Sequence, residues 1–138
     1  MDFDEKLLSQ LKPTETCHTK VVGTTFRAID WDHLKRNHVI FALQREPLNA
    51  HDPNAIRVLA YTKELPNWIQ VGYIAAPMAK ELAKGLDAKQ ISIHIEGYQI
   101  TGGKDDKSHG INLELLICHL DLRHLLSLNP FRSIDYEG

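Results

Sequence analysis

The sequence predicts a mainly β protein with helices (α+β class), in which one small β-barrel of about six strands carries a packed helix. Residues 90–99 alternate strictly, with Ile91, Ile93 and Ile95 on one face and polar side chains on the other, which is typical of a half-buried strand. Residues 38–44 are partly apolar on both faces, as in a strand of a small closed barrel. The 138 residues suffice for one hydrophobic core.

Apolar and β-branched runs separated by turn residues locate the strands. We expect strands at residues 17–26, 38–44, 55–61, 68–74, 90–99 and 111–120. Residues 101–110, rich in Gly, Lys and Asp, form the hairpin tip between the last two strands. The segment 28–37 is a loop or a turn of helix, and Trp31 and Leu34 anchor it to the core because they lie three residues apart.

One helix is predicted with a clear start and end. Pro77 suits the first turn of a helix, and Met78 and Leu82 supply its apolar side. Gly85 is expected to end this helix, since glycine is common just past a helix C-terminus.

The chain divides into a barrel at residues 18–122 with an extension at each end. The N-terminal extension, residues 1–17, includes a short helix at 3–12. The C-terminal extension covers residues 123–138, and a second short helix is expected at 122–128. No internal repeat, low-complexity run or domain linker interrupts this plan.

Composition is ordinary for a soluble globular protein, with 43% hydrophobic and 25% charged residues. No apolar run approaches the length of a membrane span, and the acidic start of the chain lacks a signal-peptide pattern, so we expect a cytoplasmic location. The net charge of −2 argues against non-specific binding to long duplex DNA, because such binding depends on many contacts between cationic side chains and phosphates. A local site for one or two nucleotides remains compatible with this charge.

The cysteines and histidines show no metal pattern. Cys17 and Cys118 are expected to be reduced thiols in or beside the core, although a disulfide between the first and last strands stays open. The eight histidines are scattered without the spacing of a zinc site. The matching dipeptides Cys17-His18 and Cys118-His119 point their side chains to opposite faces if they lie on strands, which disfavours a four-ligand site.

Catalysis is not predicted. The sequence has no nucleophile elbow, no phosphate loop and no glycine-rich dinucleotide turn. His51 beside Asp52, or His94 near Glu96, resembles an acid/base pair, but a turn and an exposed strand face explain them as well. We therefore expect neither an enzyme nor a cofactor.

Several blocks of the sequence resemble the signature of the HIRAN domain family. They are Arg45-Glu46-Pro47, the stretch 49–52, Asn54-Ala55-Ile56-Arg57-Val58, Val71-Gly72-Tyr73-Ile74 and, as a first strand, residues 21–26. Together they span most of the chain, from residue 18 to residue 120. The resemblance implies a barrel of the OB or SH3-like kind with one or two packed helices. It also implies a non-catalytic module that binds single-stranded or damaged DNA, preferably at a free 3′ end, in DNA repair or replication-fork processing.

The family's residues are carried over one position at a time. Asp52 matches the acidic residue that hydrogen-bonds the terminal 3′ hydroxyl, since a carboxylate accepts from a hydroxyl and repels a phosphate. The alternative is that Asp52 only caps its own turn. His51 matches a stacking tyrosine, and Asn49 matches an asparagine that contacts the end nucleotide.

Three further residues complete the predicted binding site. Phe26 matches a second stacking aromatic, although the residues alone favour a place in the core. Tyr73 stacks or forms a hydrogen bond. Arg45 either reaches a phosphate or forms a structural pair with Glu46 or Asp52.

The departures from the family pattern remove positive charge. Thr25 stands in place of a phosphate-binding arginine, Leu48 in place of an asparagine, and Ala75 and Ala76 in place of lysines. Arg27 is expected to face the other way on the strand. Affinity for single-stranded DNA should therefore be weaker than in the DNA-binding form of the family. A protein-interaction adaptor that has lost the DNA pocket is the alternative, and in either case a helicase or nuclease on another chain is a candidate partner.

Overall fold

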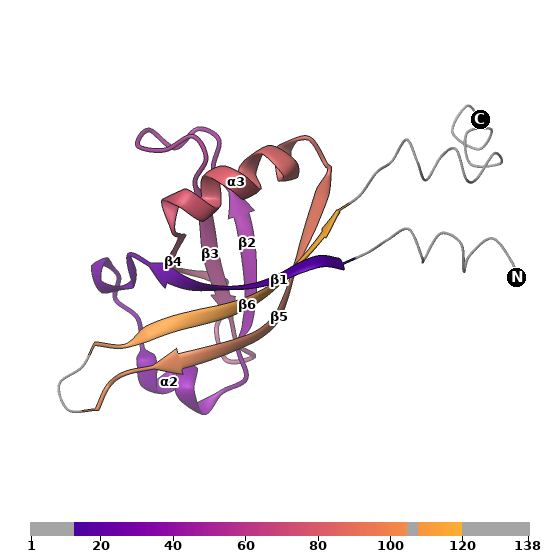
Figure 1. Ribbon diagram of the computed structural model, residues 1–138. Helices are drawn as coiled ribbons and strands as arrows, with labels where there is room; N and C mark the ends of the chain where they lie inside the picture. The colour runs from indigo at the N-terminus through magenta and orange to yellow at the C-terminus, as the bar shows by residue number, and fades with distance from the viewer. Residues whose placement is uncertain (1–12, 105–107, 120–138) are drawn as a thin grey trace, which may run out of the picture.

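Six antiparallel strands form one sheet in the order β2-β3-β4-β1-β6-β5, and this sheet curls into a nearly closed barrel with two helices on it (Figure 1). The computed structural model describes residues 13–104 and 108–119. The strands are β1 (Pro13–Val22), β2 (Ile40–Arg45), β3 (Ile56–Tyr61), β4 (Ile69–Ile74), β5 (Ile91–Thr101) and β6 (Gly110–His119). The predicted α+β barrel class is confirmed. The helices expected at 3–12 and 122–128 lie outside the described residues.

The first strand ends four residues earlier than predicted. Gly23 has a φ of 79°, in the left-handed region that glycine tolerates, and it turns the chain out of the sheet after Val22. Residues Thr24–Phe26 then form a 3₁₀ turn, η1. The prediction that the strand continues through Phe26 is therefore wrong, because the local apolar pattern does not reveal the backbone turn at Gly23.

The helix α2 (Trp31–Arg36) anchors its segment to the core as predicted. The side chain of Asp30 caps its start by accepting a hydrogen bond from the His33 amide at 3.0 Å. Leu34 is 1% exposed, and Trp31 packs against the core and stacks on His109 with ring centroids 4.9 Å apart. This stack joins α2 to the start of β6.

The helix α3 (Ala76–Asp87) begins with Pro77 in its first turn, as predicted, and buries Ala79, Leu82 and Ala83. It runs two residues beyond Gly85, so the prediction that Gly85 ends the helix is wrong. A Cβ atom on Gly85 would lie 2.9 Å from the Ile91 side chain. Glycine is therefore used here for the close approach of the helix to β5 rather than for a helix stop.

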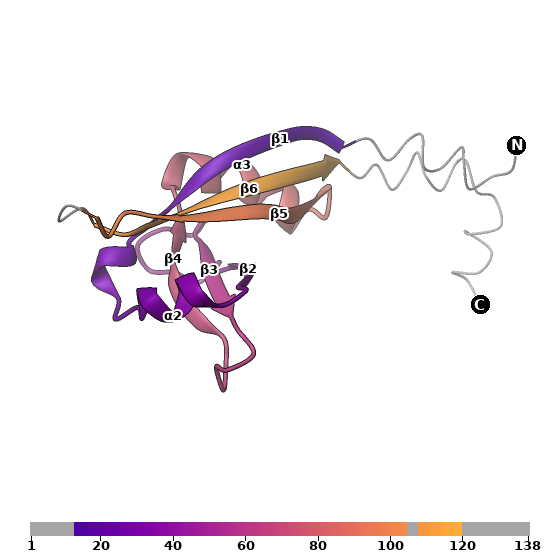
Figure 2. The ribbon, with the colours of Figure 1, turned by 90° about the horizontal axis from the view of Figure 1, so that it is seen from below.

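The hairpin of β5 and β6 has the most extensive ladder in the sheet. Ile91, Ile93 and Ile95 pack against the core, which confirms the predicted alternation. A β-bulge between Ile95 and Gly97 then shifts the register, so that Tyr98 and Ile100 face the core in their place. Figure 2 shows β1, β6 and β5 as one side of the barrel and β2, β3 and β4 as the other.

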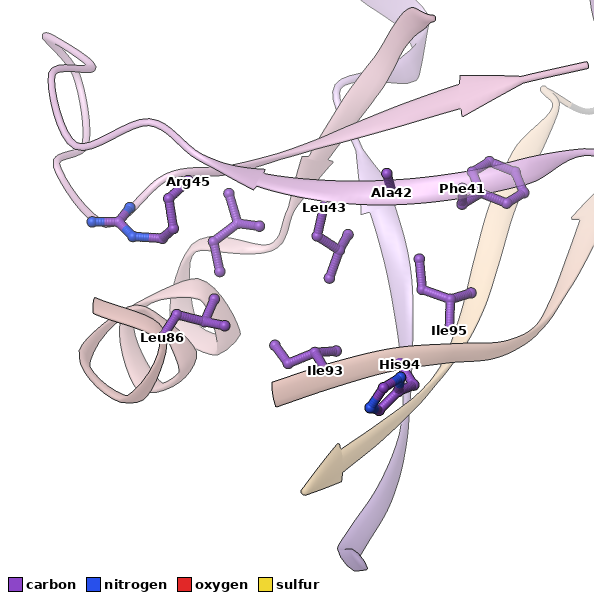
Figure 3. A pocket seen from close by; sticks show the side chains of 9 residues that line it. Phe41, Ala42, Leu43, Arg45, Leu86, Ile93, His94 and Ile95 are labelled. Atoms are coloured by element: carbon purple, nitrogen blue, oxygen red, sulfur yellow. The ribbon is translucent and has the colours of Figure 1, made fainter. Parts of the chain in front are cut away.

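The two edge strands, β2 and β5, face each other across a seam that side chains fill. Leu43 of β2 and Ile93 and Ile95 of β5 point into this seam, whereas His94 turns away from it (Figure 3). The hollow that remains has a volume of about 400 Å³. The Tyr98 hydroxyl accepts a hydrogen bond from the Val39 amide at 3.1 Å across this seam. Because β2 and β5 are the two edges of the sheet and do not pair, the barrel is closed by side-chain packing rather than by a strand ladder.

The two cysteines are free thiols that do not face each other. In the β1–β6 ladder Cys17 lies opposite Leu115, and Cys118 lies opposite Pro13. Burial raises the pKa of the Cys17 thiol, and the nearby Glu15 carboxylate raises it further, so this thiol stays protonated at neutral pH. Within the part of the chain that the structure describes, no helix is long and apolar enough to cross a membrane.

Candidate functional site

The loop between β2 and β3 is held by its own asparagine and aspartate side chains. Asn49 Oδ1 accepts hydrogen bonds from the amides of His51 at 2.9 Å and Asp52 at 3.1 Å. Asp52 Oδ1 in turn accepts from the Asn54 amide at 2.8 Å. Such Asx turns restrict the conformation of a loop through its own side chains. The loop therefore presents a defined surface, and one oxygen of Asp52 has the turn-capping role that the sequence left open.

A hollow of about 460 Å³ lies beside this loop, and we call it the Glu46 hollow. It is lined by Glu46, Pro47, Leu48, Asn49, Ala50, His51 and Tyr73. All of these residues except Tyr73 come from the loop, and Tyr73 comes from β4. The structure thus brings together three predicted site residues, Asn49, His51 and Tyr73, around a carboxylate that the sequence did not single out.

The Glu46 carboxylate organises the hollow. Its Oε1 atom accepts hydrogen bonds from the Tyr73 hydroxyl at 2.8 Å and the Asn49 side-chain amide at 3.0 Å. Its Oε2 atom lies 3.8 Å from Arg57 Nε. The Tyr73 hydrogen bond, helped by Asn49 and by the charges of Arg57 and Arg27, holds the pKa of Glu46 below its ordinary value of 4.5. Glu46 is therefore ionised at neutral pH and fixes Tyr73 as a donor.

This arrangement predicts an acid-dependent contribution to stability. A depressed carboxyl pKa stabilises the fold above the unfolded-state pKa, and this stabilisation is lost as the pH falls through the folded-state value. We expect the wild type to lose more free energy of unfolding than Glu46→Gln between about pH 6 and about pH 3, as measured by urea unfolding. Parallel pH profiles for the two proteins would contradict the network.

Arg27 supplies positive charge beside the Glu46 hollow, although the sequence predicted that it faces away. The Arg27 guanidinium carbon lies 5.9 Å from the centroid of the Tyr73 ring, within cation–π range. Arg27 follows η1 rather than lying on a strand, so the expectation that it faces away is wrong. Arg57, the second cation, donates to the side-chain oxygen of Gln44 through Nε at 2.6 Å and also through Nη2.

Phe26 lies on the surface, because its side chain is 90% exposed. The sequence-based preference for a core phenylalanine is wrong, and the cause is again the turn at Gly23. Leu48, at the loop, is 96% exposed. Leu48 thus adds an exposed apolar side chain to the rim of the Glu46 hollow, and Phe26 is an exposed aromatic next to Arg27 in the chain.

Comparison with known proteins gives a family. A family model for the HIRAN domain matches residues 14–117. The chain belongs to the HIRAN domain family. The crystal structure of the HIRAN domain of human HLTF matches with a TM-score of 0.52 and 23% sequence identity, and it covers 83% of this chain and 84% of that one. No curated protein sequence matches the chain significantly. The structural match supports the fold, and family membership supports nucleic-acid binding by a non-catalytic domain.

Arg45 of this HIRAN domain is engaged by the protein itself. Its Nε and Nη2 atoms both donate to the Asp87 carboxylate at 2.9 Å. Nη1 donates to the Ala55 carbonyl at 2.8 Å, and Nη2 donates to the Pro53 carbonyl at 2.9 Å. These contacts use four of the five N–H groups of a guanidinium. The structural alternative is therefore favoured, with Asp87 rather than Glu46 or Asp52 as the partner.

The remaining positions considered in the sequence lie outside the Glu46 hollow. Asp52 is half-buried and does not line the Glu46 hollow. Thr25 and Ala76 are exposed and Ala75 is half-buried. None of these three residues carries a charge, so they do not supply the cations that the family resemblance implies at these positions. Among residues 13–104 and 108–119, no three His, Cys, Asp or Glu side chains are grouped to hold a metal ion.

The sequence did not predict two contacts at the Glu46 hollow, that of Glu46 with Tyr73 and that of Arg27 with Tyr73. Glu46 and Tyr73 lie 27 residues apart, and nothing local to either residue indicates that they meet. Arg27 had one available signal, the glycine four residues before it, which is a frequent sign of a turn that would release the following residues from a strand.

Proposed function

We propose that this HIRAN domain binds single-stranded DNA at the Glu46 hollow and prefers a free 3′ end. The observation that carries the proposal is the Tyr73 ring, which lines the hollow beside a loop fixed by hydrogen bonds and has the Arg27 guanidinium 5.9 Å from its centroid. Phe26, exposed and next to Arg27 in the chain, is a second aromatic available for stacking. Aromatic faces stack on bases of any sequence, and a nearby cation neutralises the backbone. Binding of this kind needs little net charge, which agrees with a chain at −2.

The preference for a 3′ hydroxyl rests on the carboxylates of the loop. Asp52 uses Oδ1 to cap the turn, which leaves Oδ2 as an acceptor for a terminal hydroxyl. Glu46 adds a second negative charge at the hollow. Asp52 lies on the same loop as Glu46 but outside the lining of the hollow, so a terminal phosphate bound to it would be repelled by its charge and, at longer range, by that of Glu46. His51 is exposed and lines the hollow, and in this proposal it stacks on the last base.

The test compares two oligonucleotides that differ only at the 3′ end. Fluorescence anisotropy measures the affinity of a short single strand ending in a hydroxyl and of the same strand ending in a phosphate. We expect wild type to prefer the hydroxyl and Asp52→Asn to lose most of that preference. Asparagine keeps the Oδ1 atom that caps the turn, so the variant removes the charge without removing the loop.

Two controls make this result interpretable. Asp52→Ala removes the cap as well, and any further loss relative to Asp52→Asn reports on the loop. Repeating the titrations at several salt concentrations measures the phosphate contribution, which lowers affinity as salt rises. Equal binding of the two oligonucleotides by wild type would reject the 3′-end preference, and no binding to either at low salt would reject DNA binding by this surface.

The exposure of Leu48 favours a second candidate function. A side chain that is 96% exposed on a loop fixed by hydrogen bonds is a suitable apolar anchor for a protein partner. In that case the domain would act as an adaptor, for example for a helicase or nuclease on another chain. Binding of such a partner would depend on Leu48 and would respond weakly to salt, which separates it from DNA binding.

A further inference from the structure

The outward face of strands β2, β3 and β4 connects the Glu46 hollow with the opposite end of the sheet. Val58 and Ala60 of β3 are buried in the core, so the residues between and beside them point outward. The ladder pairs these outward residues with neighbours on the same face. In order from the Glu46 hollow to the far end of the face, the pairs are Arg57 with Gln44 and Tyr73, Leu59 with Ala42 and Gln70, and Tyr61 with Ile40.

An aromatic and apolar patch lies at the far end of this face, and we call it the Trp68 patch. It consists of Ile40, Tyr61 and Trp68. Trp68 is 45% exposed and Ile40 is 50% exposed, and the rings of Tyr61 and Trp68 have centroids 5.4 Å apart. Solvent-exposed tryptophan and tyrosine beside each other offer the flat, rigid surface on which nucleic-acid bases stack.

The spacing between the two ends suits a short single strand. Trp68, directly before β4, precedes Tyr73 by five residues, and the register shift in the β3–β4 ladder keeps both residues on the outward face. At a rise of about 3.3 Å per residue, at most about 17 Å separates them. At a repeat of about 3.4 Å for stacked nucleotides this distance corresponds to about five nucleotides, so a stacked strand of three nucleotides does not span the two ends. Single folds of this general barrel type hold about 4–16 nucleotides.

The groups between the two ends are compatible with a polyanion. The outward-pointing residues of these ladder pairs include Arg57 and two glutamines and no carboxylate. The side-chain nitrogen of Gln70, in the middle of this face, is buried without a hydrogen-bond partner among the described residues. A buried donor without a partner is costly, so a ligand that drew this amide outward would satisfy it.

We infer that a single strand with its 3′ end at the Glu46 hollow continues across this face and stacks an upstream base on the Trp68 patch. This inference rests on the proposed function and adds a second subsite to it. The ligand is a single strand of several nucleotides, and its length decides how much of the surface it uses. A protein partner would also fit an apolar patch. Apart from Glu46 at the hollow itself, which lies 3.8 Å from Arg57, the path to the patch carries no carboxylate among the outward ladder residues, and this favours a nucleic acid.

The experiment is a length series of single strands with free 3′ hydroxyls, measured by anisotropy with a label at the 5′ end. A three-nucleotide strand reaches only the Glu46 hollow, and an eight-nucleotide strand reaches both subsites. We expect Trp68→Ala to weaken the longer strand about 5- to 150-fold, the range for loss of one base–aromatic stack. The three-nucleotide strand should bind wild type and Trp68→Ala equally, which also shows that the variant is folded. Trp68→Phe keeps an aromatic face and should restore most of the loss.

The outcomes separate this inference from the proposed function. Wild type that binds neither strand at low salt overturns both. Wild type that binds both lengths with equal affinity overturns the second subsite and leaves the 3′-end site standing. The second subsite is likewise overturned if Trp68→Ala weakens both lengths equally or weakens neither, because the patch would then have another role, such as contact with a protein.

Discussion

Phe26→Ala is expected to lower the affinity for single-stranded DNA by about 5- to 150-fold while leaving the stability of the domain unchanged. The size of the loss is that of one stacked base, about 1–3 kcal/mol. Stability should change by less than about 0.5 kcal/mol, because a side chain that is 90% exposed contributes little buried surface. Anisotropy titration gives the affinity, and urea unfolding gives the stability.

Leu48→Ala is the matched control for this substitution. Leu48 is equally exposed and equally apolar, but it has no ring to stack on a base. A DNA-binding surface should therefore lose much more affinity from Phe26→Ala than from Leu48→Ala. Unchanged DNA affinity in Phe26→Ala would contradict the proposed stacking role, and loss of a protein partner in Leu48→Ala would favour the adaptor function.

The value of Phe26 as a probe comes from an error in the sequence-based prediction. The run 21–26 favours a strand by residue type, and a strand would have buried alternate side chains of that run. The positive φ of Gly23 ends the strand, after which Phe26 is exposed to solvent and Arg27 lies over the Tyr73 ring. Strand preferences are properties of single residue types. The exposure of Phe26 depends instead on the backbone conformation of Gly23, which the neighbouring residue types do not predict.

The strands were predictable because their pattern is local. Alternation in 90–99 and turn residues on both sides of 55–61 depend only on neighbours in the chain, and both strands are present at nearly the expected bounds. The bulge after Ile95 was not predictable in the same way. It preserves the core by shifting the register, so that the apolar residues at 98 and 100 face inward after those at 91, 93 and 95.

The site was predictable only as a region. The turn chemistry of residues 49–54 and the family resemblance singled out Asn49, His51 and Tyr73, and these three residues line one hollow. The groups that organise that hollow are joined by long-range contacts, such as Glu46 with Tyr73. Such contacts depend on how β2 and β4 are arranged around β3, and the local sequence carries no signal of that arrangement.

Arg45 illustrates the difference between a signature residue and a ligand-binding residue. The arginine stands in the family signature and at the end of β2, where a phosphate contact is a natural expectation. Its side chain is only 15% exposed and is held by Asp87 at the end of α3 and by the carbonyls of Pro53 and Ala55. The Asp87 hydrogen bond raises the pKa of Arg45 and lowers that of Asp87, so both groups remain charged at neutral pH. The arginine thus ties the loop that forms the candidate site to the helix.

Arg45→Lys is therefore expected to lower the free energy of unfolding by about 1–3 kcal/mol. Lysine keeps the charge but cannot form four hydrogen bonds in the planar geometry of the guanidinium, so the two loop carbonyls lose their donor. Urea unfolding measures the loss. Asp87→Asn is the control, and it should cost less, because the Asp87 side chain is 54% exposed and ion pairs in water contribute little.

The same variant decides between the two roles considered for Arg45. If it were a phosphate ligand, Arg45→Lys would leave the free energy of unfolding unchanged and Arg45→Ala would reduce the salt dependence of DNA binding. With the structural role, stability falls in both variants. Any loss of DNA affinity should then be accompanied by loosening of residues 46–55, which hydrogen exchange of the loop amides detects because their protection depends on the closed loop. Since Asn49, His51 and Asp52 all lie on this loop, the arginine acts on DNA binding only through the geometry that it imposes on them.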